Sequence, residues 1–347
     1  MKFSKKKLNM PTMIILLSSL AIITIILAAG MGSVWINPLS AAKILISKIP
    51  YVGNSVDRTF NTMEYNIIIN LRLPRVLLGM VVGASLSVCG VAMQALTRNH
   101  LADPFVLGVS SGASAFATLG MLFGTFSVFG IYHLPISAFI GSLMTITLVY
   151  SISRVKGRIN ITQLLLSGVV LSMIMDSITS IIKLSAPNAL GLHNAEFWMS
   201  GSLAGAKWEY LTLPLIILLM CMVILIINYR GLNLLLLGEE SAGTLGANVR
   251  NLQKMLIIIA SLMAGVAVSV SGCIGFVGLI VPHFTRLLVG GDHKKVLPVS
   301  ALLGGILVVW VDVVARTAIA PEELPVGILT AIIGGPIFIW LLKKRKK

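Results

Sequence analysis

The sequence predicts an all-α integral membrane protein with about ten transmembrane helices. Three observations predict this class: 56% of the 347 residues are hydrophobic, only 11% are charged, and long apolar runs alternate with short charged segments. Soluble domains carry about 25% charged residues, so this chain has too little charge to cover a surface that faces water. A membrane-spanning helix needs about 20 apolar residues, and runs of that length fit between the charges.

The expected spans follow the apolar runs in order. The first, residues 12–34, comes after a lysine-rich start, as a signal peptide would. Its apolar run is long enough to cross a membrane and no clear cleavage site follows it, so we interpret it as an uncleaved first helix. The other nine spans are expected at 75–97, 103–123, 133–153, 161–184, 209–229, 252–271, 276–290, 296–318 and 324–342.

The distribution of Lys and Arg predicts the orientation. With ten crossings, both termini lie on one side of the membrane, and that side collects nineteen of the 27 Lys and Arg residues. These residues accumulate in cytoplasmic loops, so both termini are expected in the cytoplasm. The same bias explains the net charge of +15 through membrane topology, with lipid and not nucleic acid as the partner. The basic N-terminus consists of Lys2, Lys5, Lys6 and Lys7.

Two loops and one glycine-rich segment stand out. Residues 35–74, expected outside, suit a short amphipathic helix. Residues 230–251, expected inside, combine apolar, acidic and glycine residues, and 241–249 favours one or two short helices along the membrane face. Residues 272–338 are dense in Gly and Pro. Broken backbone is tolerated in a membrane only where it is buried in protein or lines a polar cavity, which indicates a pore-forming or transporting protein.

The sequence has no catalytic pattern. It lacks a phosphate-binding loop, an HExxH motif and a nucleophile elbow, so we expect no enzyme activity, no cofactor and no metal site. His283 suits a helix end or a ligand position. Asp176 lies within the fifth expected span and favours either a proton pathway or a pairing with Lys183 or a helix end.

Three arginines lie near the expected outer face, against the general trend of positive charge. Arg72 and Arg75 flank Pro74, and Arg316 follows Asp312 by one helical turn. One interpretation is snorkelling or anchoring to lipid phosphates. The other is a docking surface for a partner that presents carboxylates, with which Arg forms bidentate, charge-assisted hydrogen bonds.

Several motifs together resemble the FecCD-type ABC permeases, which import iron-siderophores, haem or cobalamin. The resemblance covers roughly residues 65–343, with the motifs in the family's order. One departure is His100, where the family's usual Arg-Asn-Pro has proline. The motifs are RLPR (72–75), Gly90-x-x-x-Gln94, RNHLADPFVLGVSSGAS (98–114), LNLLLLGEESAGTLGANV (232–249), GxIGFVGLIVPHFTRLLVGGDH (272–293), Asp312-x-x-x-Arg316 and ELPVGILTAIIGGPIF (323–338).

The resemblance implies a type II ABC importer permease in the cell membrane, with residues 1–347 forming one permease domain. Such a subunit pairs with a second copy or a sister permease, with two ATP-binding cassette subunits and with an extracytoplasmic substrate-binding protein. An iron-siderophore is the cargo expected on base rate, and haem or cobalamin is the alternative. A proton-coupled secondary transporter is the alternative from another class, because of Asp176.

The resemblance and the glycine pattern also predict site residues. The family's outer arginines, which receive glutamates of the binding protein, match Arg72, Arg75 and Arg316. The ATPase-coupling loop, residues 230–251, matches the family at Gly238, Glu239, Ala242, Leu245 and Gly246. Glycine-rich breaks are expected to bend along a wide translocation path at the dimer axis. The residues expected for this path and its hinges are Gly108, Ser110, Gly112, Gly272, Gly275, Gly278 and Pro282.

Overall fold

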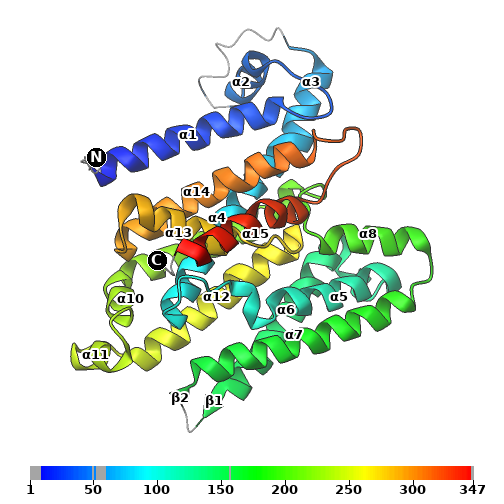
Figure 1. Ribbon diagram of the computed structural model, residues 1–347. Helices are drawn as coiled ribbons and strands as arrows, with labels where there is room; N and C mark the ends of the chain where they lie inside the picture. The colour runs from blue at the N-terminus through cyan, green and yellow to red at the C-terminus, as the bar shows by residue number, and fades with distance from the viewer. Residues whose placement is uncertain (1–8, 49–50, 52–59, 156–157, 345–347) are drawn as a thin grey trace.

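The computed structural model describes residues 9–48, 51, 60–155 and 158–344, so Lys2, Lys5, Lys6 and Lys7 lie outside the described residues. The described chain is a helical bundle (Figure 1). Eight of its helical segments are long and apolar enough to cross a membrane, and two shorter apolar helices accompany them. These ten segments coincide with the ten expected spans. They contain α1 (Met10–Gly30), α4 (Leu73–Thr97), α5 (Val109–Phe123), α6 (His133–Ser153), α7 (Ile161–Leu184), α9 (Thr212–Ile227), α12 (Val249–Ser271), α13 (Val277–Val289), α14 (His293–Ala315) and α15 (Val326–Lys344).

Shorter elements connect the long helices. The short helix expected in the 35–74 loop is α2, which buries Ala41 and Ile44. Two short strands, β1 and β2, form an antiparallel hairpin after α6, with Arg154 opposite Ile159. The remaining short elements are α2 (Pro38–Ile46), α3 (Thr62–Asn66), β1 (Arg154–Val155), β2 (Arg158–Ile159), α8 (Ala189–Met199), α10 (Tyr229–Leu235) and α11 (Glu239–Thr244).

The helix that contains α4 begins well before the expected residue 75. It runs from α3 through a π-helical turn at Ile67–Arg72 into α4. Asn61 begins it with a capping box: its side chain accepts a hydrogen bond from the Met63 amide at 3.2 Å, and Glu64 accepts one from the Asn61 amide at 3.3 Å. The longer helix fixes the direction in which the arginines of the LRLPR segment point.

Helix α8 lies in a stretch to which the sequence assigned no element. Asn188 caps it, since its side-chain oxygen accepts a hydrogen bond from the Gly191 amide at 2.6 Å. The stretch contains Gly, His and Asn and lacks a long apolar run, so hydropathy alone gave no signal there. The helix returns the chain from the end of α7 toward the centre of the bundle.

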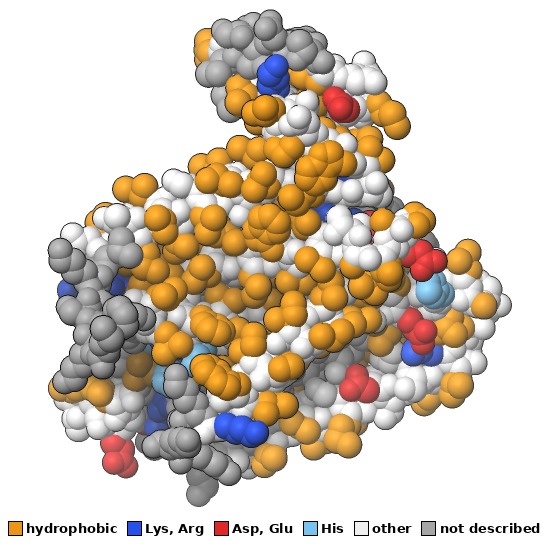
Figure 2. All heavy atoms as spheres, turned by 45° about the horizontal axis from the view of Figure 1, so that its top comes forward, with side chains coloured by type: hydrophobic (Ala, Val, Ile, Leu, Met, Phe, Trp, Pro, Cys, Tyr) orange, Lys and Arg blue, Asp and Glu red, His pale blue; other side chains and the backbone are white. Residues whose placement is uncertain are grey.

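Helix α4 is the centre of the bundle. Residues 81–96 are all buried, and α4 packs against α12, α13 and α14. Two glycines allow backbones to approach closely, as small residues do between membrane helices. A Cβ atom at Gly83 would lie 2.2 Å from the Gly304 oxygen, and one at Gly90 would lie 1.8 Å from the Gly278 oxygen. The outer surface is apolar, and Figure 2 shows hydrophobic side chains spread over much of the visible face.

The two ends of the bundle differ. Both ends of the described chain lie at the end that carries α10 and α11, whereas α2, α3 and α8 lie at the opposite end (Figure 1). This placement agrees with an even number of crossings. We refer to the two ends as the α10/α11 end and the α2/α8 end.

Candidate functional site

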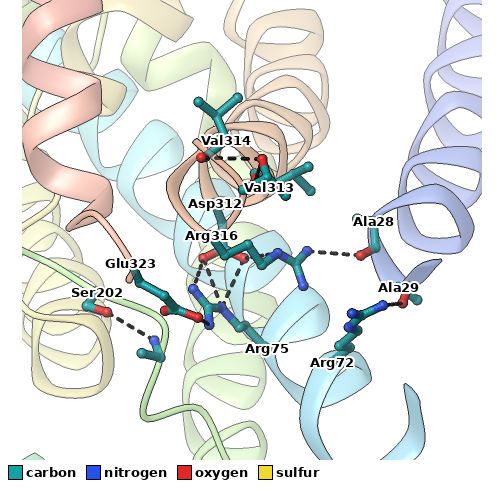
Figure 3. A network of polar contacts seen from close by, with 12 residues as sticks. Ala28, Ala29, Arg72, Arg75, Ser202, Asp312, Val313, Val314, Arg316 and Glu323 are labelled. Atoms are coloured by element: carbon teal, nitrogen blue, oxygen red, sulfur yellow. Dashed lines mark hydrogen bonds and ion pairs between the residues drawn. The ribbon is translucent and has the colours of Figure 1, made fainter. Parts of the chain in front are cut away.

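The three predicted docking arginines converge at the α2/α8 end. Arg72 and Arg75 lie at the start of α4, and Arg316 lies just after α14, beside Asp312 (Figure 3). The exposed fractions of the arginines are 7%, 8% and 4%, and that of Asp312 is 1%. Side chains from distant parts of the sequence therefore form one buried polar cluster, which we call the arginine cluster, between α1, α4 and α14.

Arg75 makes the strongest contacts of the cluster. Its Nε lies 3.0 Å from Oδ1 of Asp312, and its Nη2 lies 2.8 Å from the same oxygen. Its Nη1 also donates to Oε1 of Glu323 at 2.9 Å. Fork-like contacts of this kind are both shorter and more specific than neutral hydrogen bonds. Arg75 therefore joins the start of α4 to the end of α14 and to the loop before α15.

Arg72 and Arg316 bind the end of α1. Arg72 donates to the carbonyl oxygens of Ala29 at 3.1 Å and Gly30 at 2.8 Å, and Arg316 donates to that of Ala28 at 3.0 Å. The last carbonyls of a helix lack partners within the helix, and cationic side chains satisfy them well. Arg316 also lies 3.4 Å from a carboxylate oxygen of Asp312.

The three arginines predicted near the outer face are therefore buried at this end of the bundle. The sequence placed the residues at the correct end of the helices but could not show that they face α1 and α14.

Three guanidinium groups against the carboxylates of Asp312 and Glu323 leave one net positive charge in the cluster. A cavity of about 370 Å³ opens beside it. The docking role itself stays a prediction. The cavity lining includes Gly32, Ser33, Arg72, Arg75, Ala204, Arg316 and Glu323.

The predicted coupling loop forms two short helices at the α10/α11 end. Helix α11, Glu239–Thr244, lies between Gly238 and Gly246, whose φ angles of 103° and 86° suit glycine. Nothing lies within 4 Å of a Cβ atom placed at either glycine. Ala242 is buried, whereas Leu245 is 61% exposed. The loop thus presents small and apolar residues outward around one anchored turn of helix.

An ion pair attaches α11 to the end of α4. Arg98 Nη2 lies 3.1 Å from Oε1 of Glu239, and both side chains are about two-fifths exposed. An exposed pair of this kind contributes about 0.2–1 kcal/mol, too little to hold the loop by itself. Its position nevertheless gives a direct contact between α11 and the central helix.

The glycine-rich break between α12 and α13 lies where several backbones meet. Gly272 ends α12 with a φ of 63°, and a Cβ atom there would lie 2.0 Å from the Trp198 oxygen at the end of α8. The Cys273 thiol lies 3.8 Å from the Ser110 oxygen and 3.6 Å from Oγ of Ser114, both on α5. The structure therefore brings together Ser110 and Gly272, two of the residues predicted for the path.

The other predicted hinge residues occupy mixed environments. Gly108 has a φ of 78° at the start of α5, and a Cβ atom at Gly112 would lie 2.2 Å from Oγ1 of Thr145 on α6. Pro282 is buried within α13, and Gly278 faces α4. These residues allow close packing in this conformation, and bending at them stays a prediction. Gly275 differs, because nothing lies within 4 Å of a Cβ atom placed there.

The acid in α7 does not pair as one reading of the sequence suggested. Asp176 is exposed, and Lys183 forms its ion pair with Glu196 of α8 instead, at 2.6 Å. The hydrogen bond and charge of Lys183 lower the pKa of the Glu196 carboxyl. The sequence missed this pair because α8 was not predicted. His283 is half-buried on α13, with its ring edge-on to Phe284.

Comparisons with known proteins agree with this architecture. The model of the FecCD transport family matches residues 20–344. The hemin transport system permease protein HmuU of Yersinia pestis is 40% identical over 289 residues, which cover 83% of this chain and 86% of HmuU. The cobalamin import system permease protein BtuC of Halobacterium salinarum is 41% identical over 280 residues, which cover 81% of this chain and 74% of that protein. A solved inward-facing conformation of a metal-chelate type ABC transporter superimposes with a TM-score of 0.81 and 32% identity, over 96% of this chain and 99% of that chain.

Among the described residues, eight long and two short apolar helices have the length and composition of a multi-pass membrane protein. The family match and the relatives confirm the resemblance seen in the motifs. The chain belongs to the FecCD transport family and is an ABC importer permease of that family.

Proposed function

We propose that this chain carries an iron-siderophore chelate across the cytoplasmic membrane, as one of two permease subunits driven by two separate ATPase subunits. The observation that carries the proposal is the family match over residues 20–344, which includes both the arginine cluster and the α10/α11 loop. In this assembly the α10/α11 end, with both termini, faces the cytoplasm, and a substrate-binding protein delivers cargo to the α2/α8 end.

Helix α11 is the proposed contact with the ATPase. Leu237 and Leu245 are each 61% exposed on either side of it, which leaves apolar surface for a partner to cover. The glycines at 238 and 246 leave room for the partner's backbone to approach. Through the Arg98–Glu239 ion pair, a displacement of α11 would reach the end of α4, which packs against most of the bundle.

The cavity beside the arginine cluster is the proposed docking point for carboxylates of the binding protein. Glu323 is the most exposed acid of the cluster, with a side chain 33% exposed, and its Oε2 is buried without a hydrogen-bond partner among the described residues. A carboxylate from outside would compete with Glu323 for Arg75, while Asp312 stays in place. Charged contacts of this kind favour orientation and encounter rate more than affinity.

The relatives named above are permeases for hemin and for cobalamin. A haem or cobalamin importer of the same family is the alternative. The alternative from another class, a proton-coupled transporter motivated by Asp176, is set aside by the family match over residues 20–344.

Uptake by the complete transporter tests the cargo. The permease is reconstituted in vesicles with its ATPase and binding protein, ATP is supplied, and ferric hydroxamate and ferric catecholate siderophores, haem and cobalamin are offered at equal concentration. We expect iron from at least one siderophore to accumulate faster than haem or cobalamin. Faster uptake of haem or cobalamin would replace the proposed cargo, and vesicles without ATP give the background.

A further inference from the structure

Helix α10 attaches the predicted coupling loop to the bundle. Its Leu232 and Leu235 are 0% and 2% exposed, whereas the space around Gly238 and Gly246, which flank α11, is open. Only residues 236–238 separate the two helices. A partner that displaces α11 therefore acts on α10 through a short connection, and the contacts of α10 determine which part of the bundle follows.

Asn233 of α10 joins this helix to the start of α14. Its Oδ1 accepts hydrogen bonds from the His293 amide at 3.0 Å and from Nδ1 of the His293 ring at 2.7 Å. Its Nδ2 donates to Oδ1 of Asp292 at 2.9 Å. A backbone amide only donates and a carboxylate only accepts, so these partners fix the orientation of the side chain and use both of its polar atoms. We call this contact of Asn233 with Asp292 and His293 the Asn233 joint.

The joint completes the cap of α14. The first amide groups of a helix have no partner within the helix, and the residue just before the helix commonly supplies a cap. Asp292 accepts from the Lys294 amide at 3.1 Å in this way. The first amide of α14, that of His293, instead donates to Asn233, which lies 60 residues earlier in the chain. The start of α14 therefore cannot move away from α10 without losing part of its cap.

Burial makes the joint firmer than the ion pair that attaches α11. His293 is 0% exposed, so water has little access to replace a lost hydrogen bond, and an unpaired buried group is costly. The side chains of Arg98 and Glu239 are about two-fifths exposed, where water competes. A cation–π contact reinforces the joint, since the Lys294 ammonium lies 5.7 Å from the centre of the Tyr229 ring on α10.

Helix α14 connects the joint to the arginine cluster. It runs from His293 to Ala315, about 35 Å at about 1.5 Å per residue, between the two ends of the bundle (Figure 1). Near its far end it carries Asp312, whose Oδ1 lies 2.8 Å from Nη2 of Arg75 (Figure 3). One continuous helix therefore has its start held by the coupling loop and carries the central carboxylate of the predicted docking site.

We propose that Asn233 is a positioning residue that transmits movement of the coupling loop to α14, and through Asp312 to the arginine cluster. The inference rests on the proposed function, because it presupposes an ATPase at α11 and a binding protein at the cluster. Coupling between two sites is a reciprocal effect on binding free energies. Nucleotide bound to the ATPase therefore changes the affinity of the arginine cluster for the binding protein, and the joint carries this effect.

The complete transporter, with its ATPase subunits, tests the joint in lipid nanodiscs. We measure the Kd of the binding protein with and without a non-hydrolysable ATP analogue, and the factor between the two values is the coupling factor. The parent complex is expected to show a factor of about five or more. Asn233→Asp sets a second carboxylate against Asp292, which breaks the joint, and is expected to bring the factor close to one.

An exchange of donor and acceptor provides the rescue. Asp292→Asn alone sets two amide groups against each other and is expected to lose the coupling as well. Asn233→Asp combined with Asp292→Asn restores one donor opposite one acceptor at unchanged net charge, so the factor should return to within about twofold of the parent. Asn228→Asp is the matched control and should keep the parental factor, because its side chain bonds to Ile224 in the preceding turn, at 2.8 Å.

The outcomes separate the joint from the importer function. A parental coupling factor in Asn233→Asp, or a double variant that assembles without recovering the factor, overturns the inference. A parent complex with a factor close to one overturns it as well. If Asn233→Asp alone does not assemble, the double variant and the control decide. Failure of the importer function is seen separately, as absence of ATP-driven uptake by the parent complex.

Discussion

Replacing Arg75 with alanine is expected to lower the free energy of unfolding by about 3–5 kcal/mol, the range for removing one partner of a buried ion pair. The Asp312 carboxylate, 1% exposed, would lose its bidentate partner and keep only Arg316 at 3.4 Å. Glu323 would lose its contact at the same time. The measurement is denaturant unfolding of the purified protein in detergent, followed by tryptophan fluorescence.

The double variant separates a pair interaction from a general loss of packing. Asp312→Ala alone is expected to be similarly costly, because it leaves Arg75 buried without its main partner. When both residues are replaced, neither charge is left unpaired by the other, so the loss should be clearly smaller than the sum of the two single losses. Strictly additive losses, or a loss below about 1 kcal/mol for Arg75→Ala, would contradict the contacts described here.

Replacing Gly90 with alanine is expected to be nearly as damaging, although only one methyl group is added. Alanine normally favours a helix over glycine by about 1 kcal/mol. At Gly90 the new Cβ atom would lie 1.8 Å from the Gly278 oxygen, and both positions are backbone that cannot rotate away. Helices α4 and α13 would have to separate, at a cost of about 3 kcal/mol, the upper part of the range for overpacking.

Gly275→Ala is the matched control for this prediction, because it lies in the same glycine-rich region with nothing within 4 Å of its Cβ position. We expect its stability to stay within about 0.5 kcal/mol of the parent protein. The two variants are compared by the denaturant midpoint in detergent and by the yield of monodisperse protein. An equal effect at both positions would show that close packing of α4 on α13 is not the cause.

The positions of the ten spans were predictable because the length of an apolar run reports directly on the thickness of the membrane. The short helix at α11 was predictable in outline because glycines flank it; the structure ends it at Thr244, short of the predicted residue 249. Helix α8 was not predictable, since a short helix with polar residues has no distinct hydropathy signal.

The environment of the site residues could not be predicted, because it depends on how each helix is rotated. Arg75 pairs with Asp312, which lies 237 residues further along the chain. The sequence around either residue does not indicate the other as its partner. In the same way, helical spacing allowed an ion pair between Lys183 and Asp176, but in the structure Lys183 pairs with Glu196 on α8. Local spacing placed these residues on the correct helices, but their partners are determined by tertiary packing.

The central claim is that this chain is a permease without its own source of energy. The most direct measurement is accumulation of a labelled ferric hydroxamate siderophore in vesicles that contain either the chain alone or the chain with its ATPase and binding protein. We predict accumulation only when both partners and ATP are present, with none by the chain alone under a proton gradient. Accumulation against a concentration gradient by the chain alone would contradict the account.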